Sequence, residues 1–197
     1  MSSRYLDPTN EVAFKHLFGT EDHKSLLISF LNAMLGLKNK RLISEIQIIP
    51  QEQVPTNKEA KTSILDIQCT DKLGHKYIVE MQNHHVPDFI KRSQYYASHS
   101  YVSQSLRGTS HLELKPIILL AIANHILFPK KKKVISYHRT LDTHTYENDL
   151  QDLAYVYVEL PRFNKTEDGK NNEAKNAKRV GLKARNQANW YLCTNKQ

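Results

Sequence analysis

The chain opens with apolar residues at the three- to four-residue spacing of amphipathic helices. Asn10 can cap a helix that ends at Gly19, and Glu11 lies in its first turn, where a carboxylate suits the helix dipole. A second helix is predicted from about Asp22 to Gly36. Its apolar positions are Leu26, Leu27, Phe30, Leu31, Met34 and Leu35. The two segments predict a helical hairpin with one apolar seam.

The pattern then changes to one typical of β-strands. Residues 42–49, LISEIQII, predict a first strand. Residues 64–71 and 75–83 are two further runs of strand formers, and the three-residue loop between them ends in Gly74. Because glycine readily adopts the left-handed conformation that closes such a loop, the two runs predict a β-hairpin.

The hairpin loop fixes which residues face each other. With Asp71 opposite His75, one face is wholly apolar and pairs Leu65 with Met81, Ile67 with Val79 and Cys69 with Tyr77. The other face pairs Ile64 with Gln82, Asp66 with Glu80 and Gln68 with Ile78. Directly opposed Cβ atoms lie about 4.5–5.5 Å apart, and like charges in that arrangement destabilise a sheet. The register therefore predicts that something compensates the two carboxylates.

Two interpretations of the acidic pair follow from the residues alone. A divalent cation would compensate both charges, since Mg²⁺ is commonly held by one or two carboxylates together with water and phosphate oxygens. Alternatively, the segment is an ordinary hairpin with a polar face in solvent. A register shifted by one residue would place Asp66 and Glu80 on opposite faces and remove the argument for a metal.

A long helix is predicted after the hairpin, opening at Pro87 and Asp88, running to about Leu106 and stopping at Gly108. Phe89, Ile90, Ala97 and Tyr101 can pack, whereas a polar and aromatic stripe is formed by Arg92, Tyr96, His99 and Ser103. The tyrosines are either half-buried packing residues or, with Arg92, groups that face the carboxylates and meet a phosphate.

The rest of the folded part is predicted to contain two more strands. Residues 114–124, LKPIILLAIAN, form an apolar run typical of a strand buried on both sides, and residues 153–160 alternate as a strand does. Helices thus alternate with strands, which indicates an α/β fold with a mixed central sheet and flanking helices. Several lysines lie in solvated loops or contact a nucleic-acid backbone: Lys58, Lys61, Lys130, Lys131, Lys132 and Lys133.

Composition limits the organisation of the chain. Its 197 residues, 40% of them hydrophobic, suffice for one domain, which we expect at residues 1–163. Residues 164–197 are rich in Asn and hold eight Lys/Arg against three Asp/Glu, so we expect a disordered basic tail that carries +5 of the +8 net charge. With no membrane-length apolar run and no signal-peptide core, the chain is expected to be cytoplasmic, and its two cysteines, Cys69 and Cys193, to be free thiols.

Six segments in this order resemble the recombination-promoting nuclease/putative transposase family of the PD-(D/E)XK nuclease superfamily. They are LDPTNEVAFKHLFG at 6–19, SILDIQCTD at 63–71, YIVEMQ at 77–82, DFIKRSQYYAS at 88–98, ELKPIILLAI at 113–122 and VELPRFNK at 158–165. The resemblance covers about residues 5–165 and implies a restriction-endonuclease-like αβββαβ core.

The resemblance also implies an activity and roles for individual residues. It indicates a metal-dependent DNA endonuclease, using Mg²⁺ or Mn²⁺ and linked to recombination or mobile elements. Asp66 and Glu80 match the acidic metal ligands of the signature, Gln82 occupies the position usually held by its lysine, and Glu11 matches a further acidic position on the first helix. Since Gln82 carries no charge, helix geometry makes Arg92 the candidate for the missing cation, with Lys91 behind it and Tyr96 toward the DNA.

The tail departs from the resemblance, because after residue 165 the composition becomes polar and rich in Asn where further helical sequence is expected. Two alternatives to a nuclease therefore stay open. One is a DNA-binding remnant that keeps the fold without turnover, and the other is an interaction domain with no nucleic-acid role. No membrane partner and no particular oligomeric state are predicted.

Overall fold

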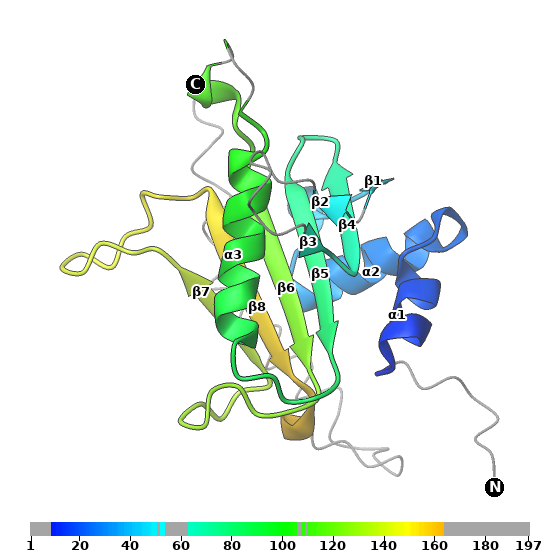
Figure 1. Ribbon diagram of the computed structural model, residues 1–197. Coiled ribbons are helices and arrows are strands. Elements are labelled where there is room, and N and C mark those ends of the chain that lie inside the picture. The colour runs from blue at the N-terminus through cyan, green and yellow to red at the C-terminus, as the bar shows by residue number, and fades with distance from the viewer. Residues whose placement is uncertain (1–8, 51, 54–62, 106–107, 109, 164–197) are drawn as a thin grey trace, which may run out of the picture.

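The computed structural model describes residues 9–50, 52–53, 63–105, 108 and 110–163, and its centre is a mixed β-sheet (Figure 1). The strands are β1 (Ile46–Ile49), β4 (Ile67–Asp71), β5 (Lys76–Gln82), β6 (Ile117–Ala123), β7 (Ile135–Arg139) and β8 (Leu153–Glu159). In space they follow the order β1-β4-β5-β6-β8-β7. The pairs β5–β6 and β6–β8 are parallel and the others antiparallel. A separate two-stranded sheet joins β2 (Glu52–Gln53) to β3 (Ser63–Ile64).

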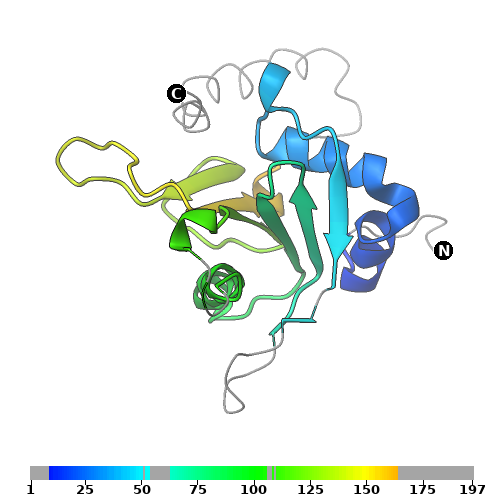
Figure 2. The ribbon, with the colours of Figure 1, turned by 90° about the horizontal axis from the view of Figure 1, so that it is seen from above.

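Helices cover both faces of the sheet. Helices α1 (Glu11–Phe18) and α2 (Lys24–Met34) lie on one side, and α3 (Phe89–Val102) lies on the other, where Figure 2 shows it end-on. The Asn10 side chain accepts hydrogen bonds from the Val12 and Ala13 N–H groups at 3.0 and 3.3 Å, which confirms the predicted cap. None of the described helices is long and apolar enough to cross a membrane.

The sheet separates two hydrophobic clusters. The cluster against α1 and α2 includes Phe14, Leu27, Leu31, Val79 and Val156. The cluster against α3 includes Leu65, Ile78, Phe89, Ala97 and Leu119. Strand β6 is buried along its whole length, as its unbroken apolar sequence predicts for a central parallel strand. The α/β class with a mixed sheet is confirmed.

The predicted register of the β4–β5 hairpin is confirmed over most of its length. Ile67 pairs with Val79, Gln68 with Ile78 and Cys69 with Tyr77. The Asp71 N–H donates to the His75 carbonyl at 3.1 Å, and Gly74 has φ +83°, the left-handed conformation that the loop requires.

The register prediction is wrong for Leu65, which joins the cluster against α3 although Ile67 and Cys69 belong to the opposite cluster. The pairing Ile49–Gln68 is followed by Glu52–Ile64. These pairings belong to two separate sheets, and the chain bends at Asp66 between β3 and β4. The β4–β5 pairing ends at Ile67, so Asp66 and Glu80 are not a ladder pair.

Other boundaries differ from the prediction. The strand expected at 42–49 begins at Ile46, after a 3-10 turn at Asn39–Arg41, and α3 ends at Val102 instead of near Leu106. Strands β2 and β7 were not predicted, and the predicted arm 64–71 is divided between β3 and β4. The expected tail, with Cys193, lies outside the described residues, and so do Lys58 and Lys61.

Candidate active site

Asp66 and Glu80 lie together where the β4–β5 pairing ends. Asp66 occupies the bend before β4, and Glu80 lies near the end of β5. They are 8% and 6% exposed, and the neighbouring Gln82 is 7% exposed. The hairpin face that could have been an ordinary solvent face is therefore buried, and two acidic side chains share an interior position.

Each carboxylate accepts a hydrogen bond from the backbone of the opposite arm. The Asp66 N–H donates to Glu80 Oε1 at 3.1 Å, and the Met81 N–H donates to Asp66 Oδ2 at 2.8 Å. These bonds satisfy N–H groups beyond the end of the β4–β5 pairing, since buried backbone donors are costly to leave unpaired. The two carboxylates thus replace the missing ladder hydrogen bonds at this end of the hairpin. The same bonds hold the Asp66 and Glu80 side chains in place.

The electrostatic compensation predicted for this pair comes first from the protein itself. Lys15 of α1 places its Nζ 3.0 Å from Asp66 Oδ1. Burial, followed by the charge of Asp66, raises the pKa of Glu80 to about 8. At neutral pH Glu80 is therefore mostly protonated, with a lysine beside the pair.

The sequence argument missed Lys15, since it considered α1 for its apolar seam and for Glu11. Helix geometry offered a signal, because Glu11 and Lys15 are four residues apart and therefore lie on one face. Which of the two reaches the carboxylates depends on the tilt of α1 over the sheet, which local sequence does not encode. In the structure it is Lys15, while Glu11 is exposed at the start of the helix.

Gln82 and Arg92 form the second polar contact of the site. The Arg92 guanidinium donates to Gln82 Oε1. Because arginine can only donate, the Gln82 carbonyl must point toward Arg92, and its amide NH₂ remains the available donor. Arg92 also lies over the Phe89 ring, at 5.4 Å from the centroid, and near Glu80, whose pKa its charge lowers. Arg92 thus lies on the flank of α3 beside the acidic pair.

The polar stripe of α3 lies only partly at the site. Tyr96 is half-buried, and its pKa is raised by burial and then by the charge of Glu80. Gln68, beside the pair on β4, donates to Ser100 Oγ at 3.3 Å. His99 stacks on Tyr95, and Ser103 bonds the Ser100 carbonyl.

The remaining predicted residues do not gather around the carboxylates. Lys91 is exposed on α3, and the four lysines Lys130, Lys131, Lys132 and Lys133 lie in the loop before β7, of which Lys131 alone is half-buried. Lys131 Nζ lies 3.0 Å from His138 Nε2, on the β7 side of the sheet. These lysines, if they contact DNA, do so away from Asp66 and Glu80.

The donor set at the acidic pair fits a hard divalent cation. Carboxylate oxygens are the ligands that Mg²⁺ and Mn²⁺ prefer, and Mg²⁺ commonly uses only one or two of them. Within the described residues no group of three or more His, Cys, Asp or Glu side chains could hold a metal, so Glu11 is not brought to Asp66 and Glu80. Binding would require Lys15 to yield Asp66 Oδ1 and Glu80 to lose its proton.

Comparison with known proteins identifies the family. A model of the PD-(D/E)XK nuclease family transposases matches residues 8–188, which extends past the segments that carried the resemblance. Comparisons with curated proteins and with solved structures gave no significant match. The matched range includes both arms of the acidic hairpin, all three α-helices and every strand of the six-stranded sheet. The chain therefore belongs to the PD-(D/E)XK nuclease family transposases.

Proposed function

We propose that the protein is a metal-dependent endonuclease that hydrolyses phosphodiester bonds of DNA during recombination or the movement of mobile elements. The observation that carries the proposal is the buried pair Asp66–Glu80, held by backbone hydrogen bonds beside Gln82. Burial, followed by the charge of Asp66, raises the pKa of Glu80, and a divalent cation would favour the ionised form of this carboxyl. Family membership supports the same reaction.

Asp66 and Glu80 would hold Mg²⁺ or Mn²⁺. When bound, such an ion lowers the pKa of a water molecule and stabilises negative charge on phosphate oxygens. The chain itself supplies donors around the reacting phosphate. Gln82, with its carbonyl bound by Arg92, directs its NH₂ group toward a phosphate oxygen or the attacking water. Lys15 supplies the positive charge that Gln82 lacks, from α1 instead of β5.

Plasmid nicking tests the activity. We expect purified protein to nick supercoiled DNA with Mg²⁺, to stop with EDTA, and to lose activity in Asp66→Ala with its fold retained. Asp149→Asn is a matched control, because Asp149 is an exposed carboxylate in the loop before β8. Equal nicking by wild type and Asp66→Ala would reject the assignment, and a loss in Glu11→Gln would restore Glu11 as a ligand.

A second candidate is a DNA-binding protein of the same family without turnover. The contact between Lys15 and Asp66 favours it, because the lysine occupies an oxygen that a metal would need. This candidate predicts DNA binding with no nicking at any Mg²⁺ or Mn²⁺ concentration, and a melting temperature that neither ion changes. Metal-dependent stabilisation that Asp66→Asn abolishes would instead support the nuclease.

A further inference from the structure

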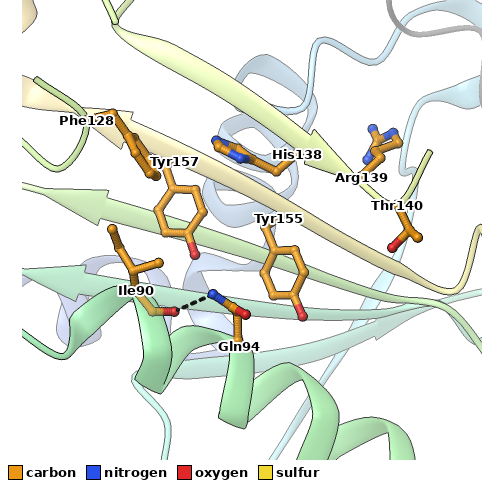
Figure 3. Close-up of a pocket in the computed structure, with 8 residues that line it drawn as sticks. All are labelled: Ile90, Gln94, Phe128, His138, Arg139, Thr140, Tyr155 and Tyr157. Atoms are coloured by element: carbon orange, nitrogen blue, oxygen red, sulfur yellow. Dashed lines mark hydrogen bonds between the residues drawn. The ribbon is translucent and has the colours of Figure 1, made fainter. Parts of the chain in front are cut away.

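A hollow lies on the flank of α3 that faces away from the acidic pair. It has a volume of about 220 Å³ between α3 and the strands β7 and β8 (Figure 3). The residues that line it are Ile90, Gln94, Phe128, His138, Arg139, Thr140, Tyr155 and Tyr157. Gln94 follows Arg92 by two residues, about 200° around the helix, so the hollow and the candidate active site lie on opposite flanks of one helix.

The hollow exists because one helix cannot cover this face of the sheet. Six strands about 4.8 Å apart span about 24 Å, whereas a helix with its side chains is about 10–12 Å wide. Helix α3 packs mainly on the central strand β6. The acidic pair lies beyond one edge of the helix, and the side chains of β8 and β7 that point to the same face lie beyond the other.

The floor of the hollow is aromatic and firmly held. The Phe128, His138 and Tyr157 rings lie with centroids 5.0–5.3 Å apart, and the Tyr157 hydroxyl is 2.7 Å from Ser93 Oγ. Tyr155 is only half-buried, and Figure 3 shows its ring beside Tyr157 with Gln94 of α3 across from it. Such a surface offers a flat ring for stacking and an amide that can both donate and accept hydrogen bonds.

A cation adjoins the aromatic floor. Lys131 Nζ lies 4.8 Å from the Phe128 ring centroid and 3.0 Å from His138 Nε2. Burial and the charge of Lys131 lower the pKa of His138, so its imidazole is neutral at pH 7 and accepts from the lysine. Lys130, Lys132 and Lys133 are exposed in the same loop. The aromatic floor thus has positive charge at one side, and Arg139, next along β7 from His138, lines its other side.

We propose that this hollow binds a single unpaired nucleobase, stacked on Tyr155 and hydrogen-bonded by Gln94, with its phosphate toward Lys131. A volume of about 220 Å³ is below the roughly 300–1,000 Å³ of pockets for larger ligands, which suits one base and not a base pair. The base can belong to a single-stranded segment of DNA or to a free nucleotide. The choice of a DNA strand rests on the proposed function, whereas base recognition rests on the hollow alone.

Fluorescence of 2-aminopurine tests the proposal, because stacking on an aromatic ring quenches it. The probe is a single-stranded oligonucleotide of about twelve nucleotides with 2-aminopurine at its centre, titrated with full-length protein in EDTA so that no cleavage occurs. We expect quenching by wild type and by Tyr155→Phe. Tyr155→Leu should abolish the quenching and weaken binding by roughly tenfold or more, because it keeps the bulk but loses the stacking ring.

Matched variants separate the hollow from general charge. Gln94→Ala should reduce quenching, whereas Gln47→Ala, which alters another exposed glutamine, on β1, should not. The fluorescence of the same probe annealed to its complement, where the base is already stacked, should not change further when protein is added. Equal quenching by wild type and Tyr155→Leu with both proteins folded, or equal quenching of the duplex, would overturn the proposal. If 2-aminopurine deoxynucleotide alone is quenched and displaces the oligonucleotide, base recognition stands and the ligand is a free nucleotide.

The nuclease proposal and the nucleobase proposal can be rejected independently of each other. Quenching by a protein that cannot nick plasmid DNA would reject the nuclease proposal and support the nucleobase site. Metal-dependent nicking with no quenching of the single-stranded probe would support the nuclease proposal and reject the nucleobase site. Asp66→Ala should lose nicking and retain quenching, because Asp66 lies beside the flank of α3 that faces away from the hollow.

Discussion

At the scale of single residues, the acidic pair depends on a lysine from a distant part of the chain. The closeness of Asp66, Glu80 and Gln82 follows from one loop and an alternating pattern, so it could be predicted from sequence, whereas the bend at Asp66 could not. Lys15 could not, because its partner is set by how α1 packs against the sheet. Its Nζ lies 3.0 Å from Asp66, where it either replaces a metal or assists one.

We predict that Lys15→Gln reduces Mg²⁺-dependent nicking by about 100-fold, in the range found when one group that stabilises transition-state charge is removed. Lys24→Gln is the matched control, since both lysines are 34% exposed and each contacts one carboxylate, that of Glu21 for Lys24. Initial rates at saturating Mg²⁺ measure the effect. Faster nicking in Lys15→Gln would mean that the lysine only obstructs metal binding.

The raised pKa of Glu80 predicts how stability depends on pH. The folded state holds its proton up to about pH 8, whereas the unfolded chain releases it near the ordinary value of 4.5. The folded state therefore binds more protons between these values, and the free energy of unfolding should fall as pH rises from about 5 to 8. In Glu80→Gln, whose amide carbonyl can still accept the Asp66 N–H, that part of the slope should vanish. Urea unfolding in EDTA at several pH values gives the pH dependence of stability for wild type and for Glu80→Gln. An identical pH dependence would mean that Glu80 is ionised in the folded state.

At the scale of elements, the hairpin register was predictable but the bend at Asp66 was not. Residues 65–67 have the alternating pattern of a continuous strand, and nothing in their sequence marks the bend. At this bend Leu65 joins the hydrophobic cluster against α3. Strand β7 escaped prediction for a different reason. It is a short edge strand with only Ser136 fully buried, so its sequence lacks the apolar alternation that reveals a strand.

The turn that sets the register can be tested alone. Gly74 has φ +83°, where a Cβ strains the backbone, and a Cβ there would also lie 3.2 Å from the Lys115 side chain. We predict that Gly74→Ala lowers the free energy of unfolding by about 1–2 kcal/mol. Gly74→Asn should cost less, because asparagine tolerates the left-handed region. Urea unfolding gives both values, and an equal cost would assign the loss to the Lys115 contact.

At the scale of the whole molecule, positive charge is unevenly placed. Residues 1–163 hold 20 Lys/Arg and 17 Asp/Glu, and residues 164–197 hold 8 and 3. Composition alone therefore assigns DNA binding to the tail. The structure adds a second basic region, the loop of Lys130, Lys132 and Lys133 beside the aromatic hollow, and it separates that loop from the acidic pair by the width of α3.

Salt dependence distinguishes these two basic regions. Each lysine that releases a counterion from duplex DNA contributes about 0.9 to the slope of log affinity against log salt. If the loop before β7 contacts the backbone, Lys130→Gln with Lys132→Gln should lower the slope by about 1 to 2. Lys38→Gln with Lys40→Gln, two exposed lysines that follow α2 on the other face, should leave it unchanged. Fluorescence anisotropy with a labelled duplex in EDTA gives the slopes. If only Lys170→Gln with Lys175→Gln lowers the slope, the tail makes the backbone contacts and the loop serves the hollow alone.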